Sequence, residues 1–235
     1  MQNAERIEPF DEDGSPARVS LFDDLNITEI GLDFERIAHG EGYRFIAGID
    51  EVGRGCIAGP VVAAACILDI DKDLPTGIND SKKLTAAVRD EITIQLKEHC
   101  VAYAIGEVDA GEIDRINILE ATKLAMLKAI DALVPRADFL LIDALQLKQT
   151  HLPQRAIIKG DSISASIAAA SILAKTYRDG LMTRYDADYP EYGFAAHKGY
   201  GCRTHYDAIR THAPCPLHRM TFKGVVEQAS TTTLF

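Results

Sequence analysis

Residues 44–68 read RFIAGIDEVGRGCIAGPVVAAACIL and combine two apolar segments with a glycine-rich turn. The first segment, RFIAGID, predicts a strand that ends at Asp50 and leads into Gly53-Arg54-Gly55. After Gly59-Pro60, the uninterrupted apolar run 61–68 predicts a buried strand. The stretch is therefore expected to contribute two strands to a β-sheet.

The rest of the chain alternates short apolar runs with longer segments of helical spacing. Further strands are predicted at 101–108, 139–143 and 155–159, and helices at 82–98, 110–133, 162–186 and 203–212. The first half of 162–186 is rich in Ala and Ser, which lets a helix pack closely against a sheet. This order predicts an α/β fold: a mixed central β-sheet flanked by helices, with a small helical C-terminal segment.

The formal net charge of −10 is concentrated at the N-terminus. Residues 1–43 contain 11 Asp/Glu and 3 Lys/Arg, whereas residues 174–223 contain 8 Lys/Arg and 5 Asp/Glu. The overall charge argues against a nucleic-acid partner, but a local basic face remains compatible with one. We expect a loosely ordered acidic extension over 1–43 with a short helix at 33–39, one folded domain over 44–225, and a mobile tail over 226–235.

Composition also bears on the compartment. The apolar run 61–68 is far too short to span a membrane, and Glu5 and Glu8 interrupt any signal peptide. Five cysteines without a Cys-x2-Cys pair argue against a disulfide framework. We therefore expect a cytoplasmic protein with no membrane association, and a monomer.

Four acidic residues follow apolar strands. Asp50 and Glu51 follow FIAGI, Asp143 follows FLLI, and Asp161 follows IIKG. Each alone is most simply a turn or helix-capping residue. If the strands lie side by side, however, their ends bring the four acids together, and a cation would relieve the repulsion.

Oxygen ligands favour Mg²⁺ or Mn²⁺ over zinc, and pairs of such ions catalyse phosphoryl transfer. Adjacent strand residues point to opposite faces, so Asp50 and Glu51 share a site only if the backbone turns there.

Two competing phosphate motifs are weak. Residues 48–55 lack the Lys and Ser/Thr of a phosphate-binding loop, and Gly59-Pro60 interrupts the helix that a dinucleotide fingerprint requires.

Several motifs in order resemble one known family. They are GIDEVGRGCIAGPVVAA (48–64), NDSKKL (79–84), LLID (140–143), KGDSISASIAAASILAKTYRD (159–179) and HKGYG (197–201). Together they resemble type 2 ribonuclease H, ribonuclease HII, from about Arg44 to Val225. The resemblance implies a ribonuclease H-like fold and a metal-dependent endonuclease. Its implied substrates are RNA–DNA hybrids and duplex DNA containing single ribonucleotides.

The resemblance also assigns roles to residues. The family's metal-binding catalytic acids fall on Asp50, Glu51, Asp143 and Asp161, with two divalent ions expected when substrate is bound. Its Gly-Arg-Gly motif falls on Gly53, Arg54 and Gly55, whose backbone contacts the 2′-hydroxyl that distinguishes RNA from DNA. Its substrate-sensing tyrosine falls on Tyr200, against the deoxyribose beside the ribonucleotide. The implied products carry 3′-hydroxyl and 5′-phosphate ends.

Several further residues are candidates for phosphate contact. Lys82 and Lys83 lie at a predicted helix start, where cations oppose the helix dipole, so a functional reason is a fair alternative to simple solvation. Ser81 precedes them in the same motif and is grouped with them. Lys175 and Arg178 are one turn apart on the helix 162–186 and are expected to face the phosphates as well.

Two patterns fall outside this interpretation. Cys202-x2-His205 and Cys215-x2-His218 approach a zinc spacing, but prolines flank Cys215 and the resemblance requires no zinc. Ser20-Leu21-Phe22 and Leu234-Phe235 resemble the Leu-Phe ends of peptides that bind sliding clamps.

Three rival functions remain open. One is another ribonuclease H-like nuclease such as a junction resolvase, against which Gly-Arg-Gly and Tyr200 argue. A second is a hybrid-binding module without catalysis, to which four acids facing phosphate would bring no benefit. The third is a nucleotide-binding enzyme, which a nucleotide titration would detect.

Overall fold

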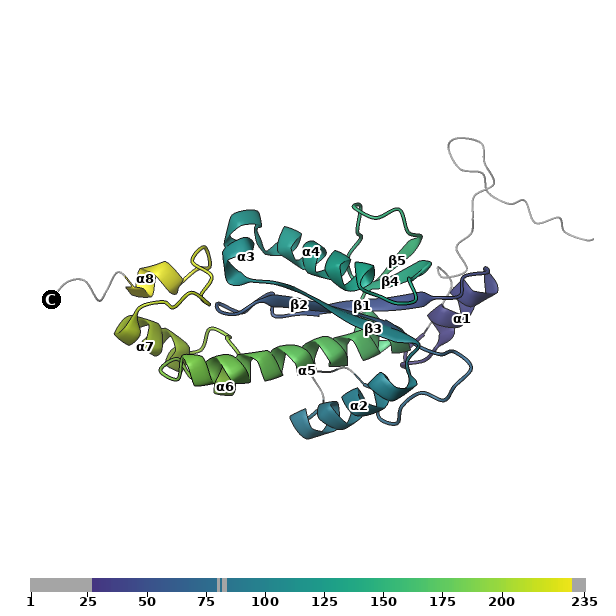
Figure 1. Cartoon of the computed structure of the whole chain (residues 1–235), viewed down its shortest axis with the longest axis horizontal. Helices are drawn as coiled ribbons and strands as arrows, with labels where there is room; N and C mark the ends of the chain where they lie inside the picture. Colours follow the sequence, from purple (N-terminus) through teal and green to yellow (C-terminus); the bar gives the residue numbers. More distant parts are fainter. Residues whose placement is uncertain (1–26, 80, 82–83, 230–235) are drawn as a thin grey trace, which may run out of the picture.

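The fold is built on one mixed five-stranded sheet. The computed structural model describes residues 27–79, 81 and 84–229 (Figure 1). The strand order is β3-β2-β1-β4-β5, with β1–β2 and β2–β3 antiparallel and β1–β4 and β4–β5 parallel. The strands are β1 (Ile46–Val52), β2 (Val61–Ile67), β3 (Ala102–Val108), β4 (Phe139–Asp143) and β5 (Gln154–Ile157). The predicted mixed sheet is confirmed.

Helices cover both faces of this sheet. The helices of the described residues are α1 (Asp33–Gly40), α2 (Ala86–His99), α3 (Ala110–Ile116), α4 (Ile118–Asp131), α5 (Ala165–Asp188), α6 (Phe194–His197), α7 (Arg203–His212) and α8 (Val225–Ala229), and a 3-10 turn, η1, spans Gly160–Ser162. Helices α3 and α4 lie over one face, and α5 crosses the other with α2 beside it (Figure 1). The β2 strand is buried along its whole length between these layers.

Small residues set the close approach of α5 to the sheet. A Cβ atom on Gly48 would lie 2.1 Å from the backbone carbonyl carbon of Ser166, so only glycine fits at this point of β1. The first half of α5 is almost entirely buried Ala, Ser and Ile. This confirms the expectation that its composition allows close packing against the sheet.

The predicted helix 110–133 is two helices, not one. Asn117 has φ +71°, which interrupts the helical backbone between α3 and α4. Its side chain accepts hydrogen bonds from the backbone N–H groups of Leu119 and Glu120, and so caps α4. Apolar spacing predicted the helical content but missed the break, because the spacing continues through Asn117. The predicted helix 82–98 begins at Ala86 in the structure, after the N-cap Thr85.

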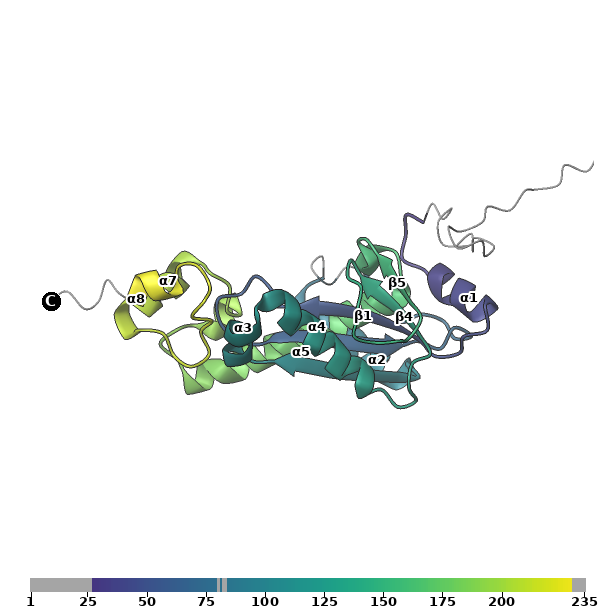
Figure 2. The ribbon, with the colours of Figure 1, turned by 90° about the horizontal axis from the view of Figure 1, so that it is seen from above.

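The two ends of the elongated molecule differ (Figure 2). At one end α6, α7 and α8 pack around Phe194 and Ile209, which confirms the small helical C-terminal segment. At the other end α1 packs through Phe34 and Ala38 onto β4 and β5. The folded domain therefore includes α1, which lies on the N-terminal side of the boundary predicted at Arg44. Residues 1–26 and 230–235 lie outside the described part.

None of the helices in the described ranges is long and apolar enough to cross a membrane.

Candidate active site

Three of the predicted acidic residues meet where parallel strands end. The register pairs Ile49 of β1 with Ile142 of β4, which places Asp50 and Asp143 on neighbouring strands at the same level. The backbone N–H of Gly160 donates to Asp143 Oδ1 at 2.7 Å, and Asp161 follows directly in η1. The structure thus brings Asp50, Asp143 and Asp161 to one edge of the sheet.

Glu51 reaches this edge in a different way. The β1 strand continues to Val52, so the turn expected between Asp50 and Glu51 is absent. The two carboxylates nevertheless interact, because the charge of Glu51 raises the pKa of Asp50. Asp50 is buried, and its Oδ1 accepts the Glu51 backbone N–H at 2.7 Å. The Glu51 carboxylate is 3.3 Å from an Arg54 guanidinium nitrogen, and Glu51 lines the neighbouring cleft.

The acids repel one another at this edge. Burial raises the pKa of Asp50 well above its ordinary value, and the charges of Glu51 and Asp143 raise it further. A hydrogen bond with Ser171 opposes the shift. Such a set of oxygen donors fits a hard divalent cation, whose charge would reverse the shift. Within the described ranges, no three His, Cys, Asp or Glu side chains are already closed around one point.

A cleft of about 400 Å³ adjoins the acids. Its lining residues are Glu51, Val52, Ser81, Arg89, Ser171, Lys175 and Tyr200. The Ser81 hydroxyl lies 2.9 Å from that of Ser171, the residue that also bonds Asp50. Lys175 Nζ lies 5.9 Å from the centre of the Tyr200 ring, which is 43% exposed. The predicted residues Ser81, Lys175 and Tyr200 therefore share one cleft, whereas Lys82 and Lys83 lie outside the described residues.

The Gly-Arg-Gly turn has one closed side and one open side. Gly53 has φ +93°, and a Cβ on it would lie 2.3 Å from Nε of Arg178. A Cβ on Gly55 would meet no atom within 4 Å. The Arg54 side chain is 45% exposed. The turn can therefore admit a ligand closely at Gly55 but not beneath Gly53.

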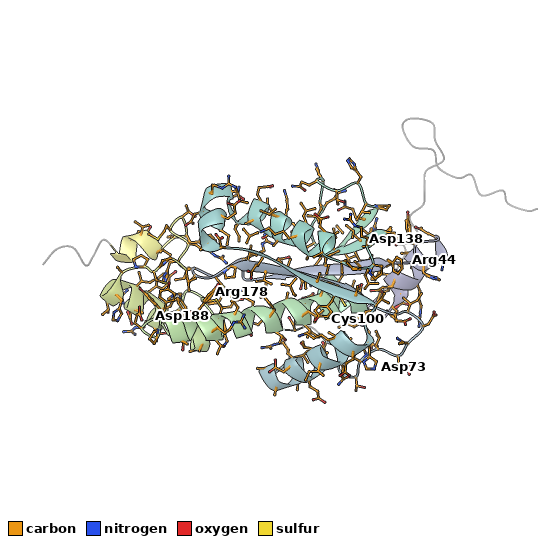
Figure 3. All side chains as sticks on the ribbon, in the orientation of Figure 1. Arg44, Asp73, Cys100, Asp138, Arg178 and Asp188 are labelled. Atoms are coloured by element: carbon orange, nitrogen blue, oxygen red, sulfur yellow. The ribbon has the colours of Figure 1, made fainter. Side chains whose placement is uncertain are left out.

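Arg178 does not face the phosphates, and that prediction is wrong. It is fully buried, and its guanidinium donates to the carbonyls of Pro60, Lys198 and Ala58 at 2.9, 2.8 and 3.1 Å (Figure 3). Its spacing from Lys175 placed it near the same helix face, but α5 passes under the glycine turn at this level. Arg178 instead joins Ala58 and Pro60, which follow that turn, to Lys198, which precedes Tyr200.

A second buried arginine was missed by the sequence analysis. Arg219 Nε and Nη2 donate to the Gly59 carbonyl at 3.0 and 2.8 Å, and Nη1 donates to the Arg54 carbonyl at 3.0 Å. Burial lowers its pKa to about 10. In a trans peptide the C=O and the following N–H point opposite ways. Because the Arg54 carbonyl points to Arg219, the Gly55 N–H points away from Arg219. No local signal marked Arg219, since its partners are about 160 residues away.

Three hydrogen bonds through two histidines hold the backbone of Tyr200. Nδ1 of His205 lies 2.9 Å from the Tyr200 carbonyl and must donate to it. His205 Nε2 therefore accepts from Nε2 of His218 at 3.1 Å, and His218 Nδ1 accepts the Cys215 backbone N–H at 3.0 Å. Cys202 Sγ lies 3.1 Å from the Thr204 hydroxyl. The histidines of the two Cys-x2-His pairs thus bond each other while Cys202 bonds Thr204, and both histidines are neutral.

We expect these histidines to make the protein acid-sensitive. Burial lowers the pKa of His205 and of His218 to about 4, from an ordinary value near 6.5. The unfolded chain binds these protons first, so stability is lost as pH falls from about 6.5 to about 4, by on the order of 3 kcal/mol for the hydrogen-bonded pair. Urea unfolding at pH 7 and pH 4.5 measures the loss. The loss of stability should be smaller in His218→Gln than in the wild type, and it should persist in His212→Gln, because His212 is exposed. Equal losses in the wild type and both variants would refute the assignment of acid sensitivity to these histidines.

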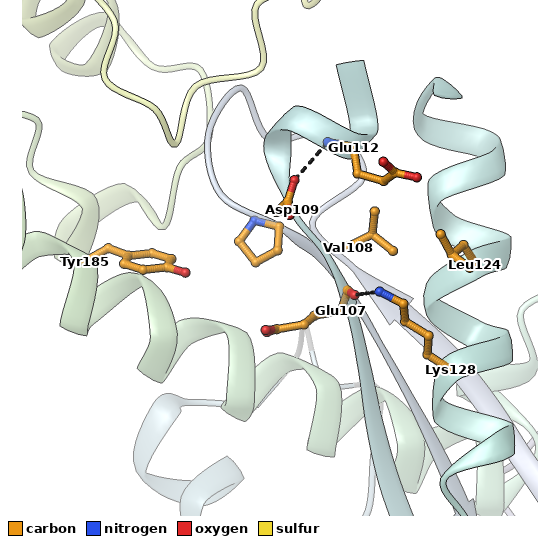
Figure 4. A pocket seen from close by; sticks show the side chains of 8 residues that line it. Glu107, Val108, Asp109, Glu112, Leu124, Lys128 and Tyr185 are labelled. Atoms are coloured by element: carbon orange, nitrogen blue, oxygen red, sulfur yellow. Dashed lines mark hydrogen bonds between the residues drawn. The ribbon is translucent and has the colours of Figure 1, made fainter. Parts of the chain in front are cut away.

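A second pocket, of about 370 Å³, opens between α5 and the α3–α4 layer (Figure 4). Its acids already have partners. Asp109 caps α3 by accepting the Glu112 N–H at 2.8 Å (Figure 4). The Glu112 carboxylate accepts from Arg115 Nε at 2.8 Å, and the Glu107 carboxylate accepts from the Tyr177 hydroxyl at 3.3 Å. This pocket is therefore a weaker candidate than the cleft beside Asp50.

Comparison with known proteins agrees with the sequence motifs. Residues 47–225 match the family model described as ribonuclease HII. The ribonuclease HII of Desulfitobacterium hafniense is 57% identical over 187 residues, which cover 80% of this chain and 72% of that protein.

Solved structures share the fold. The ribonuclease H2 of Pyrococcus horikoshii OT3 superposes with a TM-score of 0.68 at 24% identity, covering 82% of this chain and all of that one. Ribonuclease HII from the PCNA:RNase HII complex of Archaeoglobus fulgidus superposes with a TM-score of 0.65 at 25% identity, covering 78% of this chain and 96% of that one. These likenesses confirm the expected ribonuclease H-like fold.

Proposed function

The chain belongs to the ribonuclease HII family, hydrolases of the ribonuclease H type that act on RNA–DNA hybrids, and we propose that it also incises duplex DNA at single embedded ribonucleotides. The observation that carries the proposal is the convergence of buried acids at the strand ends beside a cleft that contains Tyr200. We further propose a role in removing ribonucleotides from DNA during replication and repair.

The proposed catalytic acids are Asp50, Glu51, Asp143 and Asp161. They would hold two divalent cations, Mg²⁺ or Mn²⁺, when substrate is bound. Such cations activate water and stabilise the leaving oxygen of a phosphodiester. Asp143 and Asp161 are held in a fixed relation by the Gly160 N–H bond, and the Ser81–Ser171 pair orients Asp50. Cleavage on the 5′ side of the ribonucleotide then leaves 3′-hydroxyl and 5′-phosphate ends.

The proposed recognition of RNA uses the open side of the glycine turn. The Gly55 N–H, directed away from Arg219, is suited to the 2′-hydroxyl, and Arg54 lies beside it. Tyr200 offers a half-exposed ring for the neighbouring deoxyribose. Ser81 and Lys175 in the same cleft, with Lys82 and Lys83, would contact phosphates.

A cleavage assay tests this function. Three labelled duplexes are compared with Mg²⁺, with Mn²⁺ and with EDTA: an RNA–DNA hybrid, DNA carrying one ribonucleotide, and all-DNA. We expect metal-dependent cutting of the first two only, on the 5′ side of the single ribonucleotide. Cutting of the hybrid alone would refute incision at single ribonucleotides. A 2′,3′-cyclic phosphate end would refute the proposed mechanism. Such an end forms only when the 2′-hydroxyl, instead of water, is the nucleophile.

Tyr200→Ala tests the sensing role. Loss of the ring should lower kcat/KM at a single ribonucleotide by about tenfold, because aromatic stacking on a nucleotide contributes about 1–3 kcal/mol. The same variant should cut a long hybrid with a smaller loss. Tyr103→Ala, which removes an exposed tyrosine of β3, is the matched control. Equal losses of Tyr200→Ala on both substrates would remove Tyr200 from junction sensing.

Two further proposals concern partners and compartment. The PCNA:RNase HII complex of Archaeoglobus fulgidus supports binding to a sliding clamp, and we propose that Ser20-Leu21-Phe22 or Leu234-Phe235 provides the contact. Surface plasmon resonance on the bacterial clamp would compare the full chain with variants lacking residues 1–26 or 230–235, and undetectable binding of the full chain would end the proposal.

The five cysteines are free, which suits the reducing cytoplasm. We propose that the chain acts there as a monomer.

A further inference from the structure

Glu35 of α1 is a buried carboxylate outside the part of the chain that matches the family model. It is 1% exposed, and the match covers residues 47–225. Its Oε1 accepts three hydrogen bonds from the start of α5: the Ser164 hydroxyl at 2.7 Å, and the Ser166 N–H and hydroxyl at 2.9 and 2.5 Å. One carboxylate oxygen thus holds the first turn of the central helix.

The backbone of the same segment holds the same turn. Gly31 N–H donates to the Ile163 carbonyl at 3.4 Å, and Ala165 N–H donates to the Gly31 carbonyl at 2.8 Å, which forms a parallel bridge across Ser164. The chain between Gly31 and Glu35 therefore clamps residues 163–166 from two sides.

This clamp begins two residues after Asp161. The Ser164 N–H donates to the Gly160 carbonyl at 2.9 Å, so the clamp is continuous with η1. On the other side of Asp161, the Gly160 N–H is held by Asp143. The backbone of Asp161 thus lies between two anchors, of which one is another proposed catalytic acid and the other is Glu35.

The packing of α1 against its neighbours does not by itself explain why a carboxylate is buried at Glu35. Among the described residues, Oε2 is buried without a hydrogen-bond partner, and burying an unsatisfied carboxylate oxygen is costly. The negative charge at the N-terminus of α5 offsets part of this cost. An apolar residue at position 35 would pack α1 equally well against its neighbours. It would, however, leave the three hydrogen-bond donors at the start of α5 without Glu35 as their acceptor.

We propose that Glu35 is a positioning residue of the active site, which fixes Asp161 through the first turn of α5 and so couples α1 to divalent-cation binding and turnover. This inference rests on the proposed role of the four acids. Glu35 does not act on the substrate itself; it acts through Ser164 and Ser166.

The test compares Glu35 with a matched carboxylate that joins the segments leading into β1 and β4. Asp138 accepts the backbone N–H groups of Arg44 and Phe45 at 2.9 and 2.8 Å, and so also joins distant segments (Figure 3). Full-length Glu35→Ala, Glu35→Gln and Asp138→Ala are assayed for kcat and KM on an RNA–DNA hybrid. The shift of Tm produced by Mn²⁺ alone is measured without substrate.

We expect Glu35→Ala to lower kcat by about tenfold to a hundredfold, with KM changed by less than about twofold, and to reduce the Mn²⁺-induced Tm shift. Glu35→Gln keeps an acceptor oxygen and should therefore retain most of kcat and most of the Mn²⁺-induced Tm shift. Asp138→Ala should lower Tm but keep kcat and the Mn²⁺ shift.

If Glu35→Ala lowers Tm while kcat and the Mn²⁺ shift match those of Asp138→Ala, the role is structural and the proposal is overturned. If Glu35→Ala fails to fold, Ser166→Ala, which removes the hydroxyl donor to Oε1, carries the same comparison. Failure of the wild-type protein to cut the hybrid would refute the proposed function instead. The Mn²⁺ shift would still report whether Glu35 positions the acids.

Discussion

Asp50→Asn should lower the cleavage rate of an RNA–DNA hybrid at saturating Mg²⁺ by about a thousandfold or more, which corresponds to roughly 4 kcal/mol in the barrier. Asparagine keeps the shape and the Glu51 N–H acceptor but removes the negative charge at the centre of the acid cluster. Single-turnover rates measure the effect, with the exposed Asp90→Asn on α2 as control. Full activity of Asp50→Asn would remove Asp50 from the site.

The same variant should not lose stability. Burial and neighbouring charges raise the Asp50 pKa above its unfolded value. A group with a raised pKa favours folding below its unfolded pKa, and this contribution is lost as pH rises through the folded pKa. Without metal at neutral pH, Asp50→Asn should therefore melt at or above the wild-type Tm, and the advantage should vanish near pH 4. A large drop in Tm would show that Asp50 serves the fold.

Gly53→Ala should unfold the protein about 6–12 °C earlier, a loss of about 3 kcal/mol, and abolish most activity with it. Alanine is strained at φ +93°, and its Cβ would lie 2.3 Å from Nε of Arg178. Arg178 cannot move aside cheaply, because three carbonyls hold it in a fully buried place. Differential scanning calorimetry measures the change.

Gly55→Ala is the matched variant with the opposite expectation. Its Cβ meets open space and its φ is ordinary, so Tm should change by less than about 1 °C. If substrate approaches the turn at Gly55, the added methyl group should raise KM by about tenfold. An unchanged KM on hybrid substrates would place the 2′-hydroxyl elsewhere.

Much of the site could be predicted from local sequence. Asp50, Asp143 and Asp161 each follow an apolar run, and the carboxyl ends of parallel strands meet at one edge of a sheet. The Ala- and Ser-rich start of α5 predicted its close contact with β1. These inferences succeeded because strand direction and side-chain size are properties of contiguous residues.

Other features depended on partners distant in the chain. Helical spacing placed Arg178 near Lys175 but could not show that the carbonyls of residues 58, 60 and 198 surround it. Arg219 and Glu35 carried no local signal at all. Their partners lie about 160 and 130 residues away, and only folding brings these donors and acceptors together.

The amino-acid sequence was sufficient for the type of fold, the family and the edge of the sheet where Asp50 and Asp143 meet. The orientation of the glycine turn, the burial of Arg178 and the bonds from Gly31 and Glu35 to residues 163–166 emerged only from the folded chain. The physical reason is that strand and helix patterns repeat over a few residues. A buried charge, in contrast, is satisfied by whichever carbonyls and N–H groups the packing brings within about 3 Å.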